Sequence, residues 1–499
     1  MTDCSKLWVN VYLFVILLLN NSAECYIGIG WGRMNSQRML PSMVVDMILQ
    51  NGIREVKIYT ASKNVLQAFA GTNIGITVSF PNDDLKNITG VSDAKRWLHD
   101  RVLPFLNNGV NIRYVTIGSQ PFSATYFNKT YYHAVEVLKY FQIALRGVEF
   151  ANRNIKATMS HFTDVLELVR KPSEGQFREE IRDYMVRSCQ FLQEDNAPVW
   201  LDIFPIYNVK QLFNNDIEFA FFNNNSTSVF MDGNNRYNNI FEVMYDTFIW
   251  SLRKVGIFNL TIIVGQSGWP TDGIDGANLR NAQRFHNGFL NHILNGKGTP
   301  LYPGPVDAYI HNFADENKLK VVQGGFMRHW GIYRFDGKPK YDIDFSGQGR
   351  SIKPVTGKGI THMPKRWCIF NNNTNDMTKI KMHYDFACNK SDCTSMAPGG
   401  SCSNLAFPHS ISYAFNIFFQ SRSQEMSEEG CNFGGLGVIV PNDPSTETCS
   451  FPVEILSDEI FNGNGTLYDS NGISHSMDPL LLWFTFMIMI LQTSEIFRL

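Results

Sequence analysis

Short apolar runs alternate with amphipathic stretches from residue 26 to about residue 345. Helical periodicity is clearest in Ser42–Gln50, Ala134–Val148 and Phe241–Val255. Strands that alternate with helices predict a parallel sheet, and eight strand-like runs over this length predict an α/β fold of the closed (β/α)8 TIM-barrel type. The predicted strands are Tyr26–Gly30, Val56–Tyr59, Gly75–Phe80, Ile112–Ile117, Ile155–Ser160, Val199–Phe204, Thr261–Gly265 and Asp307–Phe313.

The alternative fold for this region is a doubly wound α/β sheet. That fold binds nucleotides through a Gly-x-Gly-x-x-Gly loop after its first strand, and no such loop follows Tyr26–Gly30. A further apolar run, Phe219–Phe222, is predicted to form a hairpin in the loop after the sixth strand. In a barrel the chemistry belongs to the carboxyl ends of the strands, so the segments to inspect are 118–121 and 265–270.

Residues 1–25 have the pattern of a secretory signal peptide. Lys6 precedes the apolar run Val11–Leu19, and Ala23-Glu24-Cys25 has the small residues of a cleavage site. The apolar run is too short to span a bilayer, which argues against a membrane anchor at this end. The chain is therefore expected to be secreted.

The other end of the chain has the layout of a glycolipid (GPI) attachment signal. The uncharged run Leu480–Leu491 is shorter than the roughly 20 residues of a transmembrane helix, and a polar stretch with small residues precedes it. Ser470 or Asn471 is the candidate attachment residue, and 479–499 is the expected cleaved tail. The alternative is a tail that packs against the protein. The signal predicts a protein on the outer face of the plasma membrane.

Charge and glycosylation motifs agree with an extracellular location. The 499 residues include 44 Lys and Arg against 46 Asp and Glu, a net charge of −2. Nucleic acid is not an expected partner, because phosphate binding needs surplus cations. Several N-x-S/T motifs predict glycosylation in a secreted chain. They are Asn87, Asn128, Asn224, Asn225, Asn259, Asn372, Asn389 and Asn464.

Cysteines mark a second domain. Six of the nine lie between Cys368 and Cys449, which in a secreted chain predicts three disulfides in a small domain, with fifteen pairings open. A zinc site would favour C-x-x-C spacing, which the cluster lacks, and neither a metal ion nor a cofactor is predicted. Cys4 and Cys25 are expected to leave with the signal, and Cys189 to be a buried free thiol.

Several motifs at the predicted strands are more specific than the strand pattern. They are Ile27–Arg33, Val56–Tyr59, Pro81-Asn82 with Leu85, Phe241 with Met244 and Asp246, Gly298-Thr299-Pro300, Pro303-Gly304 and Asp315-Glu316-Asn317. In these positions residues 26–345 resemble the plant β-1,3-glucanases, family 17 of the glycoside hydrolases. The resemblance implies a barrel that cleaves β-1,3-glucan by a retaining mechanism, which uses two carboxyl groups about 5–5.5 Å apart.

The chain departs from that family at both catalytic positions. The family has its acid/base Glu after strand four, in Val-Gly-Asn-Glu, and its nucleophile Glu after strand seven, in Ser-Glu-Thr-Gly-Trp-Pro. The corresponding residues here are Gln120 and Gln266. Glu316, after strand eight, is retained. Three supporting positions also differ: Ser119 stands for the Asn before the acid/base, Asp202 for an Asn on strand six, and Met327 for a further carboxylate.

A glutamine amide has nearly the shape of a carboxyl group, but it cannot act as a general acid and is a very poor nucleophile. The predicted barrel is therefore expected to be inactive or severely impaired. The alternative is that Glu316, Asp202 or Asp315 has taken over catalysis. A cleft for glucan is still expected, with Trp31, Tyr59, Asp202, Phe204 and Trp269 as its predicted substrate-binding residues.

A second resemblance covers residues 366–451. Trp367-Cys368, Asp392-Cys393, Pro398–Cys402 and Cys431–Gly435 resemble the six-cysteine carbohydrate-binding module that often follows plant β-1,3-glucanases. That resemblance implies the pairs Cys368–Cys431, Cys388–Cys393 and Cys402–Cys449. Tyr413 and Phe415 are either glycan-stacking residues or part of a helical core. Residues 346–365 are predicted to be a linker and 452–478 a polar stalk.

Three functions fit these observations. The first is a cell-surface protein of the plant cell wall that binds β-1,3-glucan (callose) on a degenerate glucanase fold. The second is an active glucan endo-1,3-β-D-glucosidase with relocated carboxylates. The third is a protein-interaction scaffold. The two glutamines favour the first function over the second, and the sequence does not separate the first from the third.

Overall fold

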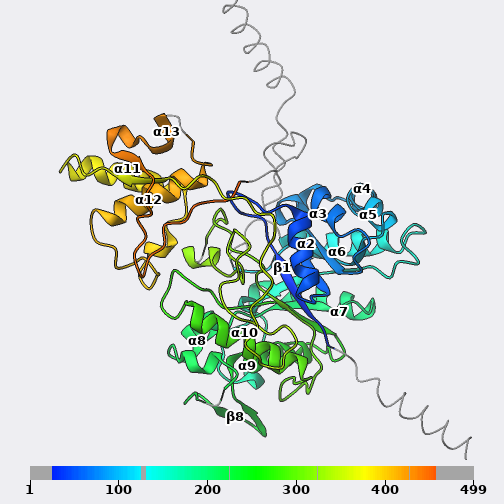
Figure 1. Ribbon diagram of the computed structural model, residues 1–499. Coiled ribbons are helices and arrows are strands. Elements are labelled where there is room, and N and C mark those ends of the chain that lie inside the picture. The colour runs from blue at the N-terminus through cyan, green and yellow to red at the C-terminus, as the bar shows by residue number, and fades with distance from the viewer. Residues whose placement is uncertain (1–24, 125–130, 224, 323, 426–427, 457–499) are drawn as a thin grey trace, which may run out of the picture.

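The computed structural model describes residues 25–124, 131–223, 225–322, 324–425 and 428–456 (Figure 1). The predicted signal peptide lies almost wholly outside these residues. The candidate attachment residues Ser470 and Asn471 and the apolar tail lie outside them too. Within the described part of the chain, no helix has the length and apolar character needed to cross a membrane.

One parallel sheet forms the barrel. Its strand order is β5-β4-β3-β2-β1-β11-β10-β7-β6, and only Met159 separates the two end strands in sequence, so the sheet closes on itself. The predicted barrel is thereby confirmed, although the predicted strand Ile155–Ser160 is divided into two short strands. The strands are β1 (Ile27–Trp31), β2 (Glu55–Ile58), β3 (Gly75–Phe80), β4 (Asn111–Ile117), β5 (Lys156–Thr158), β6 (Ser160–Phe162), β7 (Val199–Asp202), β10 (Ile262–Ser267) and β11 (Ala308–Ile310).

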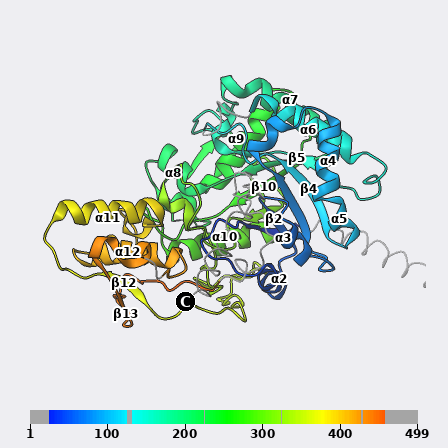
Figure 2. The same ribbon diagram turned by 90° about the horizontal axis from the view of Figure 1, so that it is seen from above.

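Helices surround this sheet, as the two ribbon views show (Figures 1 and 2). Their amphipathic faces are why they form here, because each turns an apolar stripe toward the strands. In α10, for example, Phe285, Phe289 and Ile293 are buried while Leu279 is exposed. The barrel helices are α2 (Pro41–Gln50), α3 (Lys63–Ala68), α4 (Val91–Arg101), α5 (Leu103–Asn107), α6 (Tyr131–Leu145), α7 (Arg182–Glu194), α8 (Pro205–Leu212), α9 (Ile240–Lys254) and α10 (Leu279–Leu294).

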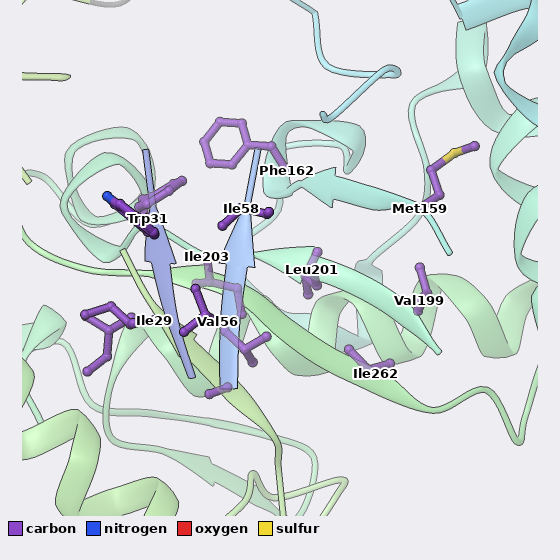
Figure 3. Packing of buried hydrophobic residues seen from close by; sticks show 14 of the residues in the cluster. Ile29, Trp31, Val56, Ile58, Met159, Phe162, Val199, Leu201, Ile203 and Ile262 are labelled. Atoms are coloured by element: carbon purple, nitrogen blue, oxygen red, sulfur yellow. The ribbon is translucent and has the colours of Figure 1, made fainter. Parts of the chain in front are cut away.

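The strands bury both faces, which explains their nearly continuous apolar runs. Residues such as Ile29, Val56 and Leu201 belong to the large cluster between sheet and helices (Figure 3). Alternate positions fill the barrel interior, where Trp200 and Tyr309 pack with Ile263. Gly28 makes room for this packing, because a Cβ there would lie 2.4 Å from the Tyr309 ring.

The predicted hairpin at Phe219–Phe222 is wrong. Residues Ile217–Ala220 form a 3-10 helix, and the Phe219 and Phe221 side chains are buried in the apolar cluster. The hairpin in this loop is β8 (Phe230–Asp232) with β9 (Asn235–Tyr237). Its two turn residues are Gly233-Asn234, between the paired residues Asp232 and Asn235, and a glycine followed by asparagine between two strands was the better signal.

The cysteine-rich region forms a small module beside the barrel (Figures 1 and 2). The disulfides Cys368–Cys431, Cys388–Cys393 and Cys402–Cys449 are present, which confirms the predicted pairing. Tyr413 and Phe415 are buried in the module, so they are core residues and not glycan-stacking faces. The elements are β12 (Trp367–Phe370), α11 (Met377–Lys390), α12 (His409–Ser421), α13 (Glu428–Cys431) and β13 (Gly437–Val440).

The segments on either side of the module run back along the barrel. His362 and Ile455 form a β-bridge, and the Ile455 side chain is buried in the barrel's apolar cluster. Parts of the predicted linker and the first residues of the predicted stalk are therefore folded against the barrel. The domain boundaries themselves stay a prediction.

The structure also places the predicted free thiol and most of the predicted glycosylation sites. The Cys189 thiol is buried and unpaired, and burial raises its pKa to about 12. Among the predicted glycosylation sites, Asn87, Asn225, Asn259, Asn372 and Asn389 are exposed. Asn128, Asn224 and Asn464 lie outside the described residues.

Candidate active-site cleft

A cleft of about 320 Å³ opens at the carboxyl ends of the barrel strands. Gln120 follows β4, Gln266 lies near the end of β10, and Glu316 follows β11, and all three side chains line it. The closed barrel brings these three residues together, although they are nearly 200 positions apart in sequence at the extremes. The cleft is thus where the sequence placed it.

The backbone after β4 turns sharply to aim Gln120 at the cleft. Gly118 has φ +71°, and Gln120 itself has φ +53°, an uncommon value for a residue with a side chain. Asn82 holds the turn from the neighbouring strand end: it accepts a hydrogen bond from the Ser119 N–H at 2.9 Å and donates one to the Ser119 carbonyl at 2.8 Å. The local fold therefore fixes the position of the Gln120 side chain.

Both glutamine amides donate to one carboxylate oxygen. Gln120 Nε2 lies 2.6 Å from Asp202 Oδ2, and Gln266 Nε2 lies 3.2 Å from the same atom. Asp202 ends β7 and is fully buried, directly opposite Gln266 of β10 in the sheet register. Asp202 consequently sits between the two positions at which the resemblance expected catalytic carboxyl groups.

A buried lysine, Lys57, lies next to Asp202 on the side away from the two glutamines' shared oxygen. Lys57 Nζ lies 4.0 Å from Asp202 Oδ1, and the ammonium also lies 5.1 Å from the centre of the Trp200 ring. Burial lowers the pKa of Lys57, and the Asp202 carboxylate opposes that shift. Burial likewise raises the pKa of Asp202, against the effects of Lys57 and Gln120. The attraction between the two groups favours their charged forms at the base of the cleft.

Glu316 is the retained carboxyl group, and it is already hydrogen-bonded within the protein. Its Oε1 accepts from the Met34 N–H at 2.9 Å, and its Oε2 accepts from Asn312 Nδ2 at 2.8 Å. A Cβ on Gly32 would come within 2.1 Å of Oε1, so the glycine leaves space for this carboxyl group. Burial raises the pKa of Glu316 to about 7.

Aromatic side chains form much of the cleft wall. Trp31, Tyr59 and Phe204, three of the predicted substrate-binding residues, line the cleft, and the Tyr59 hydroxyl contacts His311 Nδ1 at 3.1 Å. Flat aromatic faces suit the apolar faces of sugar rings. Further aromatic lining comes from Phe80, Phe162, Tyr207 and Trp330.

Trp269 does not belong to this wall, which corrects its prediction as a substrate-binding residue. Its side chain is fully buried, packs against Phe221 and Phe285, and donates from Nε1 to the Gly276 carbonyl at 3.0 Å. The Trp269 ring thus lies among Phe221 and Phe285 of α10, in the layer outside the strands. The prediction for Asp202 holds only indirectly. Its side chain is fully buried and does not line the cleft, but it is hydrogen-bonded to Gln120 and Gln266, which do.

The sequence analysis missed several residues of this site. Phe162 was missed because the predicted fifth strand stopped at Ser160, two residues too early. Tyr207 lies on α8, away from any strand end. Lys57 carried a usable signal, because a lone cation within the apolar run Val56–Ile58 needs a buried counter-charge.

Comparison with known proteins agrees with this geometry. Residues 27–345 match the model of glycosyl hydrolases family 17, and residues 366–438 match the X8 domain. The chain is 36% identical to glucan endo-1,3-beta-glucosidase 8 of Arabidopsis thaliana, over 92% of this chain and 94% of that protein. It is 38% identical to glucan endo-1,3-beta-glucosidase 5 of the same plant, over 89% and 92%.

A solved structure supports the same assignment. The barrel is similar to CJP38, a beta-1,3-glucanase and allergen of Cryptomeria japonica pollen, with a TM-score of 0.61 and 28% identity. That similarity covers 64% of this chain and 99% of the pollen protein, which corresponds to the barrel without the module. On the fold, the cleft and these relatives, the chain belongs to family 17 of the glycosyl hydrolases and carries a C-terminal X8 domain.

Proposed function

We propose that this protein binds β-1,3-glucan (callose) at the surface of plant cells and does not cleave it. The observation that carries the proposal is the Gln120–Asp202–Gln266 cluster. Retaining hydrolysis needs a nucleophilic carboxylate and a second carboxyl group that gives up a proton. At the two strand ends there are amides instead, and the one carboxylate between them is buried and bound to both.

The same cluster supports binding. Because each amide nitrogen donates to Asp202, each Gln side chain can present its carbonyl oxygen as a hydrogen-bond acceptor. Sugar hydroxyl groups donate to such acceptors, while the aromatic walls stack on the rings. A cleft that keeps these groups and lacks the carboxyl pair suits glucan recognition without turnover.

Glu316 supports the competing function, an active glucanase with relocated carboxylates. A carboxyl group with a pKa of about 7 is suited to general acid catalysis near neutral pH. Both its oxygens are, however, engaged by Met34 and Asn312, and its side chain is only 7% exposed. A proton donor must be free to reach the glycosidic oxygen, and the hydrogen bonds to Met34 and Asn312 would have to be given up first. Binding without cleavage is therefore the better-supported function.

The location is part of the proposal. The signal-like N-terminus and the GPI-like C-terminus support a protein that is secreted and then held on the outer face of the plasma membrane, next to the wall. Release of the native protein from plant membranes by phosphatidylinositol-specific phospholipase C would support the anchor. Retention of the 479–499 tail in the mature protein would contradict it.

The glucan proposal is tested by retention of the full secreted protein on insoluble β-1,3-glucan. We expect retention on that glucan, none on cellulose, and release by soluble β-1,3-glucan. Phe204→Ala should weaken retention about fivefold, the effect of losing about 1 kcal/mol of aromatic contact. Phe258→Ala is the matched control, because Phe258 is 70% exposed and lies outside the cleft. Absence of retention would favour the protein-interaction scaffold.

A further inference from the structure

We propose that the X8 module increases the affinity of the barrel's cleft for its ligand. It does so by holding in place the loop that forms one wall of the cleft. We call residues 317–322 and 324–330 the cleft loop. Leu319, Lys320, Val322, Met327 and Trp330 of this loop line the cleft. Asp392 of the module is the main positioning residue. The inference rests on the proposed function only where it concerns glucan affinity.

The module grips the far end of the cleft loop through a buried carboxylate. Asp392 Oδ1 lies 3.2 Å from Arg328 Nη1, and Asp392 Oδ2 lies 3.1 Å from His329 Nε2. The Asp392 side chain is only 6% exposed. Arg328 and His329 lie in sequence directly between Met327 and Trp330, which line the cleft. Holding Arg328 and His329 in place therefore also holds the positions of Met327 and Trp330.

Residues of the barrel hold the same histidine, His329, from the other side. His329 Nδ1 lies 3.6 Å from Asp315 Oδ2, and Lys340 Nζ lies 2.6 Å from Asp315 Oδ1. Burial disfavours a charged imidazole, but Asp392 and Asp315 outweigh burial and raise the pKa of His329 to about 10. The imidazolium is therefore shared by a carboxylate of the module and a carboxylate of the barrel, which couples the two domains at this point.

A second grip lies at the start of the cleft loop. Glu454, in the segment that follows the module, accepts hydrogen bonds from Asn317 Nδ2 at 3.4 Å and from Ser36 Oγ at 3.3 Å. Asn317 in turn donates to Ser36 Oγ at 2.8 Å, and the Lys318 N–H donates to the Met34 carbonyl at 2.8 Å. The chain leaving the module thus ties the start of the loop to the segment that follows β1.

Between these two sets of contacts, the module also packs closely against the middle of the cleft loop. A Cβ on Gly325 of the cleft loop would lie 2.4 Å from Thr394 Oγ1. Next to it, Asp272 of the barrel accepts hydrogen bonds from Ser395 Oγ at 2.8 Å and from the Ser401 N–H and Oγ at 2.7 Å. The module therefore contacts the loop at its middle and its end, and the segment that follows the module contacts it at its start.

The consequence is pre-organisation of the cleft. A loop that is ordered before the ligand arrives spares the ligand the free-energy cost of ordering it. When the grip at Asp392 is lost, the cleft loop should open locally more often, and only the fraction of molecules with an ordered wall should bind glucan fully.

The test compares Asp392→Asn with Asp385→Asn in the full chain. Asp385 lies on the same module and pairs with Lys381 on the surface, with 47% of its side chain exposed. Hydrogen exchange of the cleft-loop amides should rise at least about fivefold in Asp392→Asn, with unchanged exchange in the barrel strands, and stay at the native rate in Asp385→Asn. The affinity for a β-1,3-linked glucose hexasaccharide should fall at least about fivefold in Asp392→Asn only.

The two measurements, hydrogen exchange and hexasaccharide affinity, distinguish failure of this proposal from failure of the proposed function. Unchanged loop exchange in Asp392→Asn overturns the proposal whether or not glucan binds. Faster exchange with native hexasaccharide affinity overturns the coupling to the cleft. If the unmodified chain does not bind the hexasaccharide, the proposed function is wrong, and the exchange comparison still decides the positioning role. Should Asp392→Asn fail to fold, Arg328→Met removes one of the two ion pairs of Asp392 from the barrel side and is expected to change both measurements in the same direction.

Discussion

Glucanase turnover is expected to appear when Gln120→Glu and Gln266→Glu are combined with Asp202→Asn, and to be absent or far weaker without the third change. The two restored carboxyl groups would otherwise surround Asp202 Oδ2, where the amide nitrogens now lie at 2.6 and 3.2 Å. Three carboxyl groups at such distances cannot all ionise, because like charges raise each other's pKa. The nucleophile and the proton donor would then not hold their required protonation states.

Replacing Asp202 removes this conflict and leaves an amide between two acids. General acid–base catalysis typically contributes about 10²- to 10⁴-fold. We therefore expect the triple variant to release reducing ends from soluble β-1,3-glucan at least about 100-fold faster than the double variant. Equal rates in the two variants, including no activity in either, would contradict the role given to Asp202. Robust hydrolysis by the unmodified chain that Glu316→Gln abolishes would show that Glu316 has been recruited.

Asp202→Asn alone is expected to destabilise the folded protein by about 3 kcal/mol at pH 5. The substitution removes the charge 4.0 Å from Lys57 Nζ and leaves a buried cation without its partner. Burial then lowers the pKa of Lys57 further below its value in the unfolded chain. The unfolded chain therefore binds more protons, so stability should rise with pH up to the unfolded lysine pKa of about 10.4.

Denaturant unfolding at pH 5 and pH 9 measures this effect. The loss of stability should be smaller at pH 9, and adding Gln120→Glu should recover part of it by returning a carboxylate to the cluster. Asp183→Asn is the matched control, since Asp183 is 79% exposed and pairs only at the surface with Arg187, and it should cost less than about 0.5 kcal/mol. An equal loss at both pH values would contradict this prediction, because it would show that the pKa of Lys57 does not fall into this pH range when the Asp202 charge is removed.

The sequence predicted the barrel well because each strand buries both faces and leaves a nearly continuous apolar run. The pattern was less accurate at the fifth strand: the break at Met159 leaves no mark in it, because Met159 is buried like its neighbours, and one expected strand is two. The error at Phe219–Phe222 has a different cause. Two buried phenylalanines at alternate positions suit a strand and also suit a tight 3-10 turn over an apolar cluster.

The sequence predicted the site residues correctly where a local motif determines the position of the side chain. It failed where contacts between distant parts of the chain determine that position. Gln120 reaches the cleft through the turn at Gly118, and Gln266 reaches it because it lies next to the end of β10. Trp269 also follows the end of β10, but its ring is buried against Phe221 and Phe285. The shared contact of both amides with Asp202, and the hold of Asp392 on the cleft loop, depend on residues far apart in sequence and needed the structure.

The most direct test of the central claim is one titration followed by analysis of the same sample. A β-1,3-linked glucose hexasaccharide is titrated calorimetrically into the full unmodified protein near pH 6, and the sugar is then recovered and its chain length measured. Binding without cleavage predicts a saturable heat of binding and hexasaccharide that is recovered intact after prolonged incubation. Shorter oligosaccharides in the recovered sample, or no saturable binding, would contradict it.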